Sequence, residues 1–436
     1  YLCSMVTTEQ LYDFYQDHPV VSTDTRHLPK GCIYFALKGP NFNGNTFAKK
    51  ALELGAAYAV VDEPAGDDPR ILMVKDVLTS LQELATLHRH RLDIHVLAIT
   101  GSNGKTTTKE LCAAVLKKNF ETHYTRGNLN NHIGVPLTLL ELNEDHDFAV
   151  VEMGANHQRE IAELCEIACP DFGLITNIGK AHLEGFGGEE GVKKGKGEMY
   201  DYLRSHGELI FIQLDNPVLR EVLHGYDNIV TYGHSKTVQF QGNVIENTTG
   251  FLEVEITRPF HLRIKTQLTG DYNLDNVLSA VAVGSQFGVE PHEIQEAIEH
   301  YTPGNQRSQV VKIGNLTIIQ DMYNANPSSM TAALQNFDKS FSGKKIIALG
   351  EMRELGASSE EEHEKIADLA ARLKNTQLLL VGHLFKSPAE RIGCKYFDDS
   401  TACTEWLKSN IPSEGNLLIK GSRGSKMEKL MEAFAV

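Results

Sequence analysis

The sequence lacks a long apolar run. No stretch of its 436 residues approaches the ~20 consecutive apolar residues that a membrane-spanning helix requires. Hydrophobic residues nevertheless make up 41% of the chain, an ordinary share for a globular protein. The first residues, YLCSMVTTEQLYDFY, have neither the basic start nor the apolar core of a secretory signal. We therefore expect no membrane insertion and a location in the cytoplasm.

Paired cysteines are also missing. The seven cysteines are scattered and odd in number, and none of them forms a C-x-x-C pair. This spacing indicates neither a disulfide framework nor a cysteine-based zinc site.

Positive charge is in deficit. Acidic residues number 57 and basic residues 42, which leaves a formal net charge of -15. Binding to a nucleic-acid polymer depends on neutralising many phosphates, so we expect no such partner. A small anion is different, because a lysine ~4 Å from a phosphate gains about 4 kcal/mol at an effective dielectric of about 20. Local cations therefore decide which anions bind.

Helix-like and strand-like segments alternate in three blocks. Up to about residue 90 they predict a small α/β domain, followed by a polar linker at HRHRLDIH. The next block predicts a mainly parallel sheet, to which the alternating segments FLEVEIT and HLRIKTQL add antiparallel strands. After the turn-rich YTPGNQRS, a doubly wound unit resembling a Rossmann fold is expected. The predicted class is α/β, with domains over residues 1–92, 93–303 and 304–436.

The stretch VLAITGSNGKTTTKELCAAVLKKN joins a strand-like run to a helix-like run through a glycine-rich turn. Such a turn directs backbone N–H groups and the positive end of the helix dipole at one point, and glycine lets a phosphate approach the main chain. Lys105 adds a cation and Thr106 a hydroxyl suited to Mg²⁺. The usual P-loop spacing needs glycine where Ile99 stands, so this is a shortened variant. It predicts nucleotide binding, although glycines that merely turn the chain are the alternative.

Three further side chains are candidates with ordinary alternatives. Glu152 ends the strand-like FAVVEMG, where a carboxylate could hold Mg²⁺ or be a plain strand-end acid. His182 follows the next strand-like run, and a neutral imidazole can ligate a metal, but a loop histidine is the commoner case. Lys196, judged by itself, is predicted to be an exposed helix lysine.

Several segments, taken together and in order, resemble the Mur ligase family: TGSNGKTTTKE, RGNLNNHIGVPLTLLEL, VVEMGANHQREI, NIGKAHLEGFG, GKGEMYDYL, GDYNLDN, DMYNANPSSM, LGEMRELG and KGSRGSKME. The resemblance covers all three domains and implies ATP-driven amide formation in peptidoglycan synthesis. UDP-N-acetylmuramoyl-tripeptide would accept the γ-phosphoryl group of ATP on its terminal carboxylate, and D-alanyl-D-alanine would then displace phosphate. Such chemistry depends mainly on positioning and charge neutralisation. A monomer is expected, and no motif distinguishes lysine from diaminopimelate in the tripeptide.

The resemblance also implies roles in the central domain. Lys105 would contact the β- and γ-phosphates, while Thr106 and Glu152 would hold one Mg²⁺. His182 would help to hold a second Mg²⁺, and Lys196 matches a lysine that the family carbamylates to a carboxylate-like anion. The ATP-binding residues implied here are Gly101, Ser102, Asn103, Gly104, Lys105, Thr106, Thr107 and Asn276.

The C-terminal domain is implied to complete the ATP site. Arg307 and Asp321 match residues that meet the phosphates and the ribose, so this domain would close on the central one. Closure would keep water from the acyl phosphate. Asn324 and Asn326, within YNANP, would serve the nucleotide or the dipeptide, whereas a plain helix start at Asn326-Pro327 is the alternative.

Residues on the substrate side are implied as well: Thr25, Arg26, Asn41 and Phe42 for the UDP-sugar and Asn131 for the muramoyl group. Turn chemistry is the alternative for the Asn-rich loop. The family's usual DGH is replaced by Asn43-Gly44-Asn45, which puts individual UDP contacts in doubt.

Other functions were weighed. A folylpolyglutamate synthase would lack the UDP-binding first domain, and the Mur step that adds a diamino acid has another signature where YNANP stands. A nucleotide-binding regulatory protein without turnover is the alternative from a different class, but the implied catalytic residues are intact.

Overall fold

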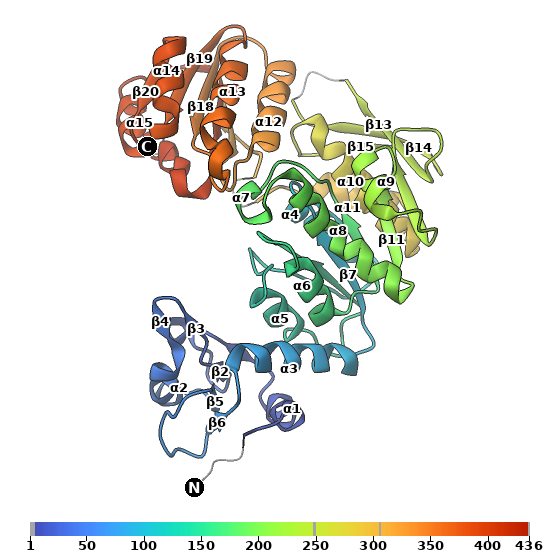
Figure 1. The fold of residues 1–436 in the computed structure, drawn as a ribbon. Helices are drawn as coiled ribbons and strands as arrows, with labels where there is room; N and C mark the ends of the chain where they lie inside the picture. Colours follow the sequence, from blue (N-terminus) through green and yellow to red (C-terminus); the bar gives the residue numbers. More distant parts are fainter. Residues whose placement is uncertain (1–4, 247–249, 305–306, 435–436) are drawn as a thin grey trace.

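The computed structural model describes residues 5–246, 250–304 and 307–434, and it forms three α/β domains that follow one another along the chain (Figure 1). The predicted fold class is confirmed. The turn-rich segment that we expect between the second and third domains includes residues 305–306, and one of the seven cysteines is Cys3; these residues lie outside the described part of the chain.

The N-terminal domain is built on a parallel four-stranded sheet in the order β1-β2-β5-β6, with a small β3–β4 hairpin beside it. Helix α1 begins with a capping box at Thr7 and buries its apolar side chains against α3. The elements are α1 (Thr8–Asp17), β1 (Val21–Ser22), β2 (Ile33–Phe35), β3 (Lys38–Gly39), β4 (Phe42–Asn43), α2 (Ala48–Glu53), β5 (Tyr58–Val61), β6 (Ile71–Met73) and α3 (Val77–Arg91).

Helix α3 connects the first two domains and corrects one prediction. The polar segment HRHRLDIH is not a free linker, because α3 continues through Arg91. His88 is buried with its ring centroid 4.9 Å from that of Tyr15. Arg89 is buried too and donates from Nη2 to Asp171 at 2.9 Å. The polar side chains find partners inside the protein, so their polarity does not mark a loop.

The central domain carries a nine-stranded sheet in the order β15-β14-β13-β12-β11-β10-β7-β9-β8. The strands from β8 to β13 run parallel, and β14 and β15 are antiparallel additions, as predicted. Helices cover both faces. The elements are β7 (His95–Thr100), α4 (Lys105–Leu116), β8 (Thr122–Tyr124), α5 (Gly134–Leu139), β9 (Phe148–Glu152), α6 (Glu160–Ala168), β10 (Phe172–Ile175), α7 (Leu183–Phe186), α8 (Glu189–His206), β11 (Leu209–Gln213), α9 (Pro217–Leu223), β12 (Ile229–Gly233), β13 (Phe240–Ile245), β14 (Glu253–Arg258), β15 (Leu262–Lys265), α10 (Leu274–Gln286) and α11 (Pro291–His300).

Strand β7 explains why this sheet is buried on both faces. Val96 and Ala98 belong to one hydrophobic cluster, while Leu97 and Ile99 belong to another on the opposite side. A strand with apolar side chains on both faces needs a helical layer on each side. The carboxyl ends of β7, β9 and β10 consequently meet at one sheet edge between these layers.

The C-terminal domain has a six-stranded sheet in the order β16-β17-β21-β18-β19-β20, parallel except for the β16–β17 hairpin at its edge. This confirms the predicted doubly wound unit and adds the hairpin to it. The elements are β16 (Gln309–Ile313), β17 (Asn315–Asp321), α12 (Pro327–Ser340), β18 (Lys345–Gly350), α13 (Ser359–Ala371), β19 (Thr376–Val381), α14 (Lys386–Ile392), β20 (Lys395–Phe397), α15 (Ser400–Lys408) and β21 (Glu414–Lys420), before the 3-10 helix Met427–Phe434.

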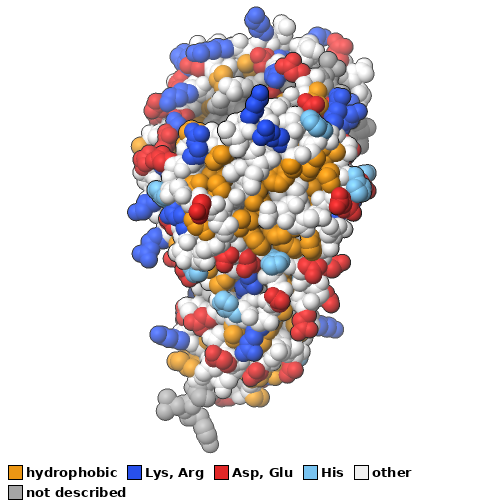
Figure 2. All heavy atoms as spheres, turned by 90° about the vertical axis from the view of Figure 1, so that its right-hand side faces the viewer, with side chains coloured by type: hydrophobic (Ala, Val, Ile, Leu, Met, Phe, Trp, Pro, Cys, Tyr) orange, Lys and Arg blue, Asp and Glu red, His pale blue; other side chains and the backbone are white. Residues whose placement is uncertain are grey.

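The surface carries charges of both signs. Figure 2 shows the side of the molecule with β13 and β14, where acidic and basic side chains are interspersed around a central group of apolar side chains. Among the described residues, none of the helices combines the length and the apolar character needed to cross a bilayer. The six described cysteines are all free thiols.

Candidate active site

The glycine-rich turn connects β7 to α4 at the carboxyl edge of the central sheet. Gly101 has φ of +140°, and a Cβ there would lie 2.0 Å from Oγ1 of Thr176. Gly104 caps α4 with φ of +80°, and a Cβ there would lie 2.7 Å from Oδ1 of Asn276. Neither position tolerates a larger residue. Both glycines are therefore required by the close packing of the turn.

Backbone amides of the turn are divided between two uses. Ser102 donates its N–H to the carbonyl of Asn177 at 2.9 Å, and Asn103 donates to Oδ1 of Asn177 at 3.0 Å. These bonds hold the turn against the loop after β10. Helix geometry leaves the first-turn amides, from Lys105 onward, without partners inside α4, at the positive end of its dipole. This first turn is the part best suited to an anion.

Lys105 brings a cation to the same point. Its Nζ donates to the carbonyl of Gly101 at 2.7 Å, folding the side chain back over the turn. Burial lowers the pKa of Lys105 from its ordinary value; the Glu152 carboxylate opposes this shift, and the Arg307 guanidinium adds to it. A bound anion would supply the counter-charge that this lysine lacks.

Glu152 ends β9 directly beside the turn and is 2% exposed. Thr106 donates from Oγ1 to one carboxylate oxygen at 2.8 Å, and Asn130 donates from Nδ2 to the other at 2.8 Å. Thr106 and Glu152, which are predicted to hold one Mg²⁺, are thus in direct contact. Sequence reasoning singled out Asn131 in this loop and missed its neighbour Asn130.

Lys109 is a second residue that sequence reasoning missed. It lies one helical turn after Thr106, is almost fully buried, and donates from Nζ to the carbonyl of Thr125 at 2.7 Å. The same Nζ is 3.9 Å from the Glu152 carboxylate. Burial lowers the pKa of Lys109, which the Glu152 carboxylate opposes. The three-residue spacing from Thr106 was the signal available, because it puts both side chains on one face of α4.

A cavity of about 900 Å³ lies where the central and C-terminal domains meet. It brings together the glycine-rich turn, the Asn-rich loop and the YNANP segment. The predicted site residues that line it are Ser102, Asn103, Gly104, Lys105, Thr107, Asn131, Glu152, His182, Asn276, Arg307, Asp321, Asn324 and Asn326. Among the described residues predicted for the ATP and metal sites, Gly101, Thr106 and Lys196 are not part of this lining.

Asn326 links the two domains at the cavity. It donates from Nδ2 to Oδ1 of Asn103 at 2.8 Å. Its own Oδ1 accepts from the N–H of Ser329 at 2.9 Å, and Pro327 takes the first helical position of α12. The helix-start alternative is therefore confirmed, and the same side chain also reaches Asn103 in the glycine-rich turn. Asn276 uses Oδ1 for Thr108 and Nδ2 for Asn273, which leaves each end of its amide one further hydrogen bond.

The remaining predicted C-terminal residues, two charged and one polar, also line the cavity. The guanidinium of Arg307 lies 3.9 Å from the centroid of the Tyr323 ring, and its buried Nε finds no hydrogen-bond partner among the described residues. Asp321 forms an ion pair with the buried Lys420, another cavity residue that sequence reasoning missed. Asn324 accepts from the N–H of Ala325. Burying a charged group without a hydrogen-bond partner costs free energy, so an anionic ligand that bonded to Arg307 would be stabilised here.

Lys196 lies in α8 and is only 1% exposed, so the prediction of an exposed helix lysine is wrong. Its Nζ donates to the carbonyl of Ala155 at 3.2 Å and lies 5.1 Å from the centroid of the Phe186 ring. Burial lowers the pKa of Lys196 well below its ordinary value, and the positive charge of Lys105 lowers it further. The amine is therefore held toward its neutral form.

His182 stands at the N-cap of α7, and its Nδ1 contacts the carboxylate of Glu354 in the C-terminal domain. Within the described chain, no three His, Cys, Asp or Glu side chains group closely enough to form a metal centre by themselves. The oxygens of Thr106 and Glu152 still fit Mg²⁺, which typically takes one or two carboxylates together with phosphate oxygens and water.

Residues 99–284 match the Mur ligase middle domain, and residues 306–423 match the Mur ligase, glutamate ligase domain. UDP-N-acetylmuramoyl-tripeptide--D-alanyl-D-alanine ligase of Escherichia coli K12 is 36% identical over 430 residues, which are 95% of this chain and 93% of that protein. The chain belongs to the Mur ligase family. The enzyme of the same name from Bacillus subtilis 168 is 34% identical over 94% of this Mur ligase and 92% of its own length.

Solved structures agree with this family. The chain matches MurF from Acinetobacter baumannii with a TM-score of 0.88 at 31% identity, over 98% of each chain. It matches MurF ligase from Thermotoga maritima in complex with ADP with a TM-score of 0.84 at 27% identity, over 95% of this Mur ligase and 96% of that chain. The resemblance read from the sequence motifs is confirmed.

The predicted UDP segment of the Mur ligase lies apart from the cavity. Of the described residues that line the cavity, none comes from Thr25, Arg26, Asn41 or Phe42. Arg26 pairs with Asp24 at 2.7 Å, and Phe42 is 58% exposed on β4.

The segment Asn43-Gly44-Asn45, which replaces the family's usual DGH, has a local structural role in this Mur ligase. Asn45 is buried and donates from Nδ2 to Asp62 at 2.8 Å, and the N–H of Asp62 donates back to Oδ1 of Asn45. Asn131 accepts from the N–H of Gly134 at 2.9 Å. The turn chemistry expected as an alternative for Asn131 is therefore present, while the residue also lines the cavity.

Proposed function

We propose that this Mur ligase uses ATP to join D-alanyl-D-alanine to UDP-N-acetylmuramoyl-tripeptide, forming the pentapeptide precursor of peptidoglycan. Relatives that carry this name match over nearly the whole chain. The single structural observation that carries the proposal is one cavity that is lined both by the glycine-rich turn and by Arg307 and Asp321. The Thermotoga maritima relative is a complex with ADP, which supports nucleotide binding by this Mur ligase.

The chemistry asks these residues for charge neutralisation and positioning. The first-turn amides of α4 and the Lys105 ammonium would hold the β- and γ-phosphates, and Arg307 would face the same charge from the other domain. The tripeptide carboxylate would attack the γ-phosphorus to give an acyl phosphate and ADP. The amino group of D-alanyl-D-alanine would then attack the acyl carbon, releasing phosphate and losing a proton.

Two Mg²⁺ ions belong to the proposal. Thr106 and Glu152 would hold the first, because their oxygens already lie within 2.8 Å of each other in a buried setting. His182 would help to hold the second. Bound Mg²⁺ would neutralise charge on the transferred phosphoryl group. Asn130 and Lys109 would orient the Glu152 carboxylate and balance its charge.

Lys196 is proposed to be carbamylated. A neutral amine adds CO₂ and releases a proton as the carbamate anion forms, and the lowered pKa of Lys196 favours that neutral amine. The modification would also turn the repulsion between Lys196 and Lys105 into attraction. The new anion could then face Mg²⁺.

The remaining roles follow the family resemblance. Residues 1–92 would bind the UDP-sugar through Thr25, Arg26, Asn41 and Phe42, and Asn131 would face the muramoyl group. Residues 93–303 would bind ATP, with Asn276 near adenine. Residues 304–436 would complete the site, with Asp321 at the ribose and with Asn324 and Asn326 on the nucleotide or dipeptide side. We expect a cytoplasmic monomer.

Phosphate release from ATP tests this function. It should require UDP-N-acetylmuramoyl-tripeptide and D-alanyl-D-alanine together, and mass spectrometry should detect the pentapeptide product. The Lys105→Ala variant should lose the reaction, whereas Lys117→Ala, an exposed lysine at the end of the same helix, should retain it. Release that ignores both substrates would contradict the proposal and indicate a simple ATPase.

A further inference from the structure

Two residues with unusual backbone conformations meet across the boundary between the central and C-terminal domains. His182, at the start of α7, has φ of +53°, and Glu354, in the loop after β18, has φ of +62°. Residues other than glycine rarely adopt this left-handed backbone conformation. It costs of order 1–3 kcal/mol and recurs at functional sites. The Glu354 carboxylate contacts the imidazole ring of His182.

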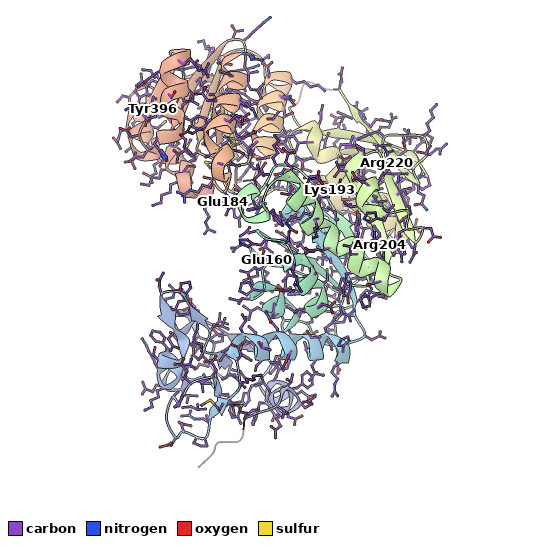
Figure 3. The ribbon with its side chains drawn as sticks, viewed as in Figure 1. Glu160, Glu184, Lys193, Arg204, Arg220 and Tyr396 are labelled. Atoms are coloured by element: carbon purple, nitrogen blue, oxygen red, sulfur yellow. The ribbon has the colours of Figure 1, made fainter. Side chains whose placement is uncertain are left out.

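The backbone supports the same contact. The N–H of Glu184 donates to the carbonyl of Glu354 at 3.3 Å. At Gly356, with φ of +54°, a Cβ would lie 3.3 Å from Cβ of Glu184, so the loop docks closely on the first turn of α7. Figure 3 labels Glu184 on α7, where that helix faces the C-terminal domain. The contact is therefore a docked loop and not a single pair of surface charges.

His182 lines the cavity, and a carboxylate oxygen of Glu354 contacts its buried Nδ1, which forms no hydrogen bond with any other described residue. A carboxylate that accepts a hydrogen bond from one imidazole nitrogen fixes the ring orientation and leaves the lone pair on the other nitrogen. Histidines that ligate metals almost always have such a partner.

We propose that Glu354 is a positioning residue that holds Nδ1 of His182, so that Nε2 is the nitrogen available to a ligand in the cavity. The C-terminal domain then contributes to the second metal position through its loop, without touching the metal. That consequence rests on the proposed function, whereas the orientation of the ring does not. Separation of the two domains would release His182 and weaken this position.

Two measurements test the proposal. In protein with ¹⁵N-labelled histidine, with the His182 signals assigned from a His182→Gln variant, we expect Nδ1 protonated and Nε2 unprotonated at pH 8. Glu354→Ala should abolish this preference. Glu354→Gln should retain part of it, because the amide oxygen still accepts a hydrogen bond. Glu360→Ala is the matched control, since Glu360 is an exposed glutamate in the first turn of α13.

Manganese binding in the presence of ADP, followed by electron paramagnetic resonance, gives the second readout. Glu354→Ala should weaken one of two bound Mn²⁺ ions by about 10- to 100-fold and leave the other unchanged. An unchanged His182 tautomer in Glu354→Ala would overturn the proposal. A shifted tautomer with only one Mn²⁺ bound to the unmodified protein would support the positioning role and contradict the second metal of the proposed function instead.

Discussion

The central domain is attached to its two neighbours in different ways. At the first junction α3 packs along the central domain against α5 and α6 (Figure 1). The buried rings of Tyr15 and His88 lie at this contact. Tyr15 donates from its hydroxyl to the carbonyl of Leu140 at 2.6 Å, and Nε2 of His88 lies 2.9 Å from the carbonyl of Leu142. Aromatic surface and satisfied polar tips are buried together here, which favours a fixed junction.

The second junction is polar and surrounds the cavity. Asn326 reaches Asn103, Ser328 accepts from the N–H of Lys180 at 3.1 Å, and Glu354 reaches His182. A typical hydrogen bond contributes only about 1 kcal/mol net, so a few such bonds can open and close at low cost. The proposed nucleotide site therefore lies at the junction made of polar contacts, whereas buried rings form the junction with the first domain.

The largest expected effect concerns Lys196, beneath the polar junction. Lys196→Ala should lower ligase activity by about 10²- to 10³-fold, because a charged group beside the phosphates is lost. Acetate or another small carboxylic acid should restore part of it by replacing the carbamate. Lys194→Ala, an exposed lysine two positions earlier, is the control. Full activity in Lys196→Ala would contradict the assignment.

The next effect breaks the rigid junction. His88→Ala should lower the free energy of unfolding by about 3 kcal/mol, because it leaves a hole among buried rings and removes the contact with Leu142. Urea titration measures this change. His90→Ala, on the exposed side of the same helix, should have little effect. Equal losses in the two variants would show that the buried contact does not fix the junction.

Acid should weaken the same junction. Burial lowers the pKa of His88 in the folded protein below its ordinary value near 6.5. Below that pH the unfolded chain binds a proton that the folded chain excludes, so stability is lost as the pH falls. The slope for this group is at most about 1.4 kcal/mol per pH unit. Urea midpoints between pH 8 and 5 should fall less steeply in His88→Gln than in the unmodified protein; identical slopes would refute this.

The smallest effect sharpens the polar junction. Asn326→Ala removes both the bond to Asn103 and the cap of α12, and should cost about 1 kcal/mol of stability and raise the KM for ATP several-fold. Asn326→Ser keeps a capping oxygen but is too short to reach Asn103. It should retain the stability and still show the raised KM. A normal KM in the serine variant would remove the junction bond from the account.

Local patterns predicted the elements that carry local chemistry. The apolar run of β7, the glycine turn and the periodicity of α4 follow from residues adjacent in the chain, and Glu152 stands at the end of its own strand. The polar end of α3 misled, because His88 and Arg89 find their partners 54 and 82 residues away. A run of polar residues in the sequence does not show whether distant parts of the chain supply buried partners for them.

Burial of Lys196 was equally hidden. In α8 the neighbouring Gly195 lets the Phe186 ring approach, since a Cβ there would lie 2.4 Å from that ring. A helix with small residues can bury a lysine on a face that appears polar in sequence. The contacts of Asn103 with Asn326 and of His182 with Glu354 join separate domains, so no local pattern contains them.

A structure with Mg²⁺ and a non-hydrolysable ATP analogue tests the central claim most directly. The account predicts the triphosphate on the first-turn amides of α4 and on Lys105, with Arg307 and Asp321 contacting the same nucleotide from the C-terminal domain. A nucleotide bound outside this cavity, or one held there without either of those two residues, would contradict it.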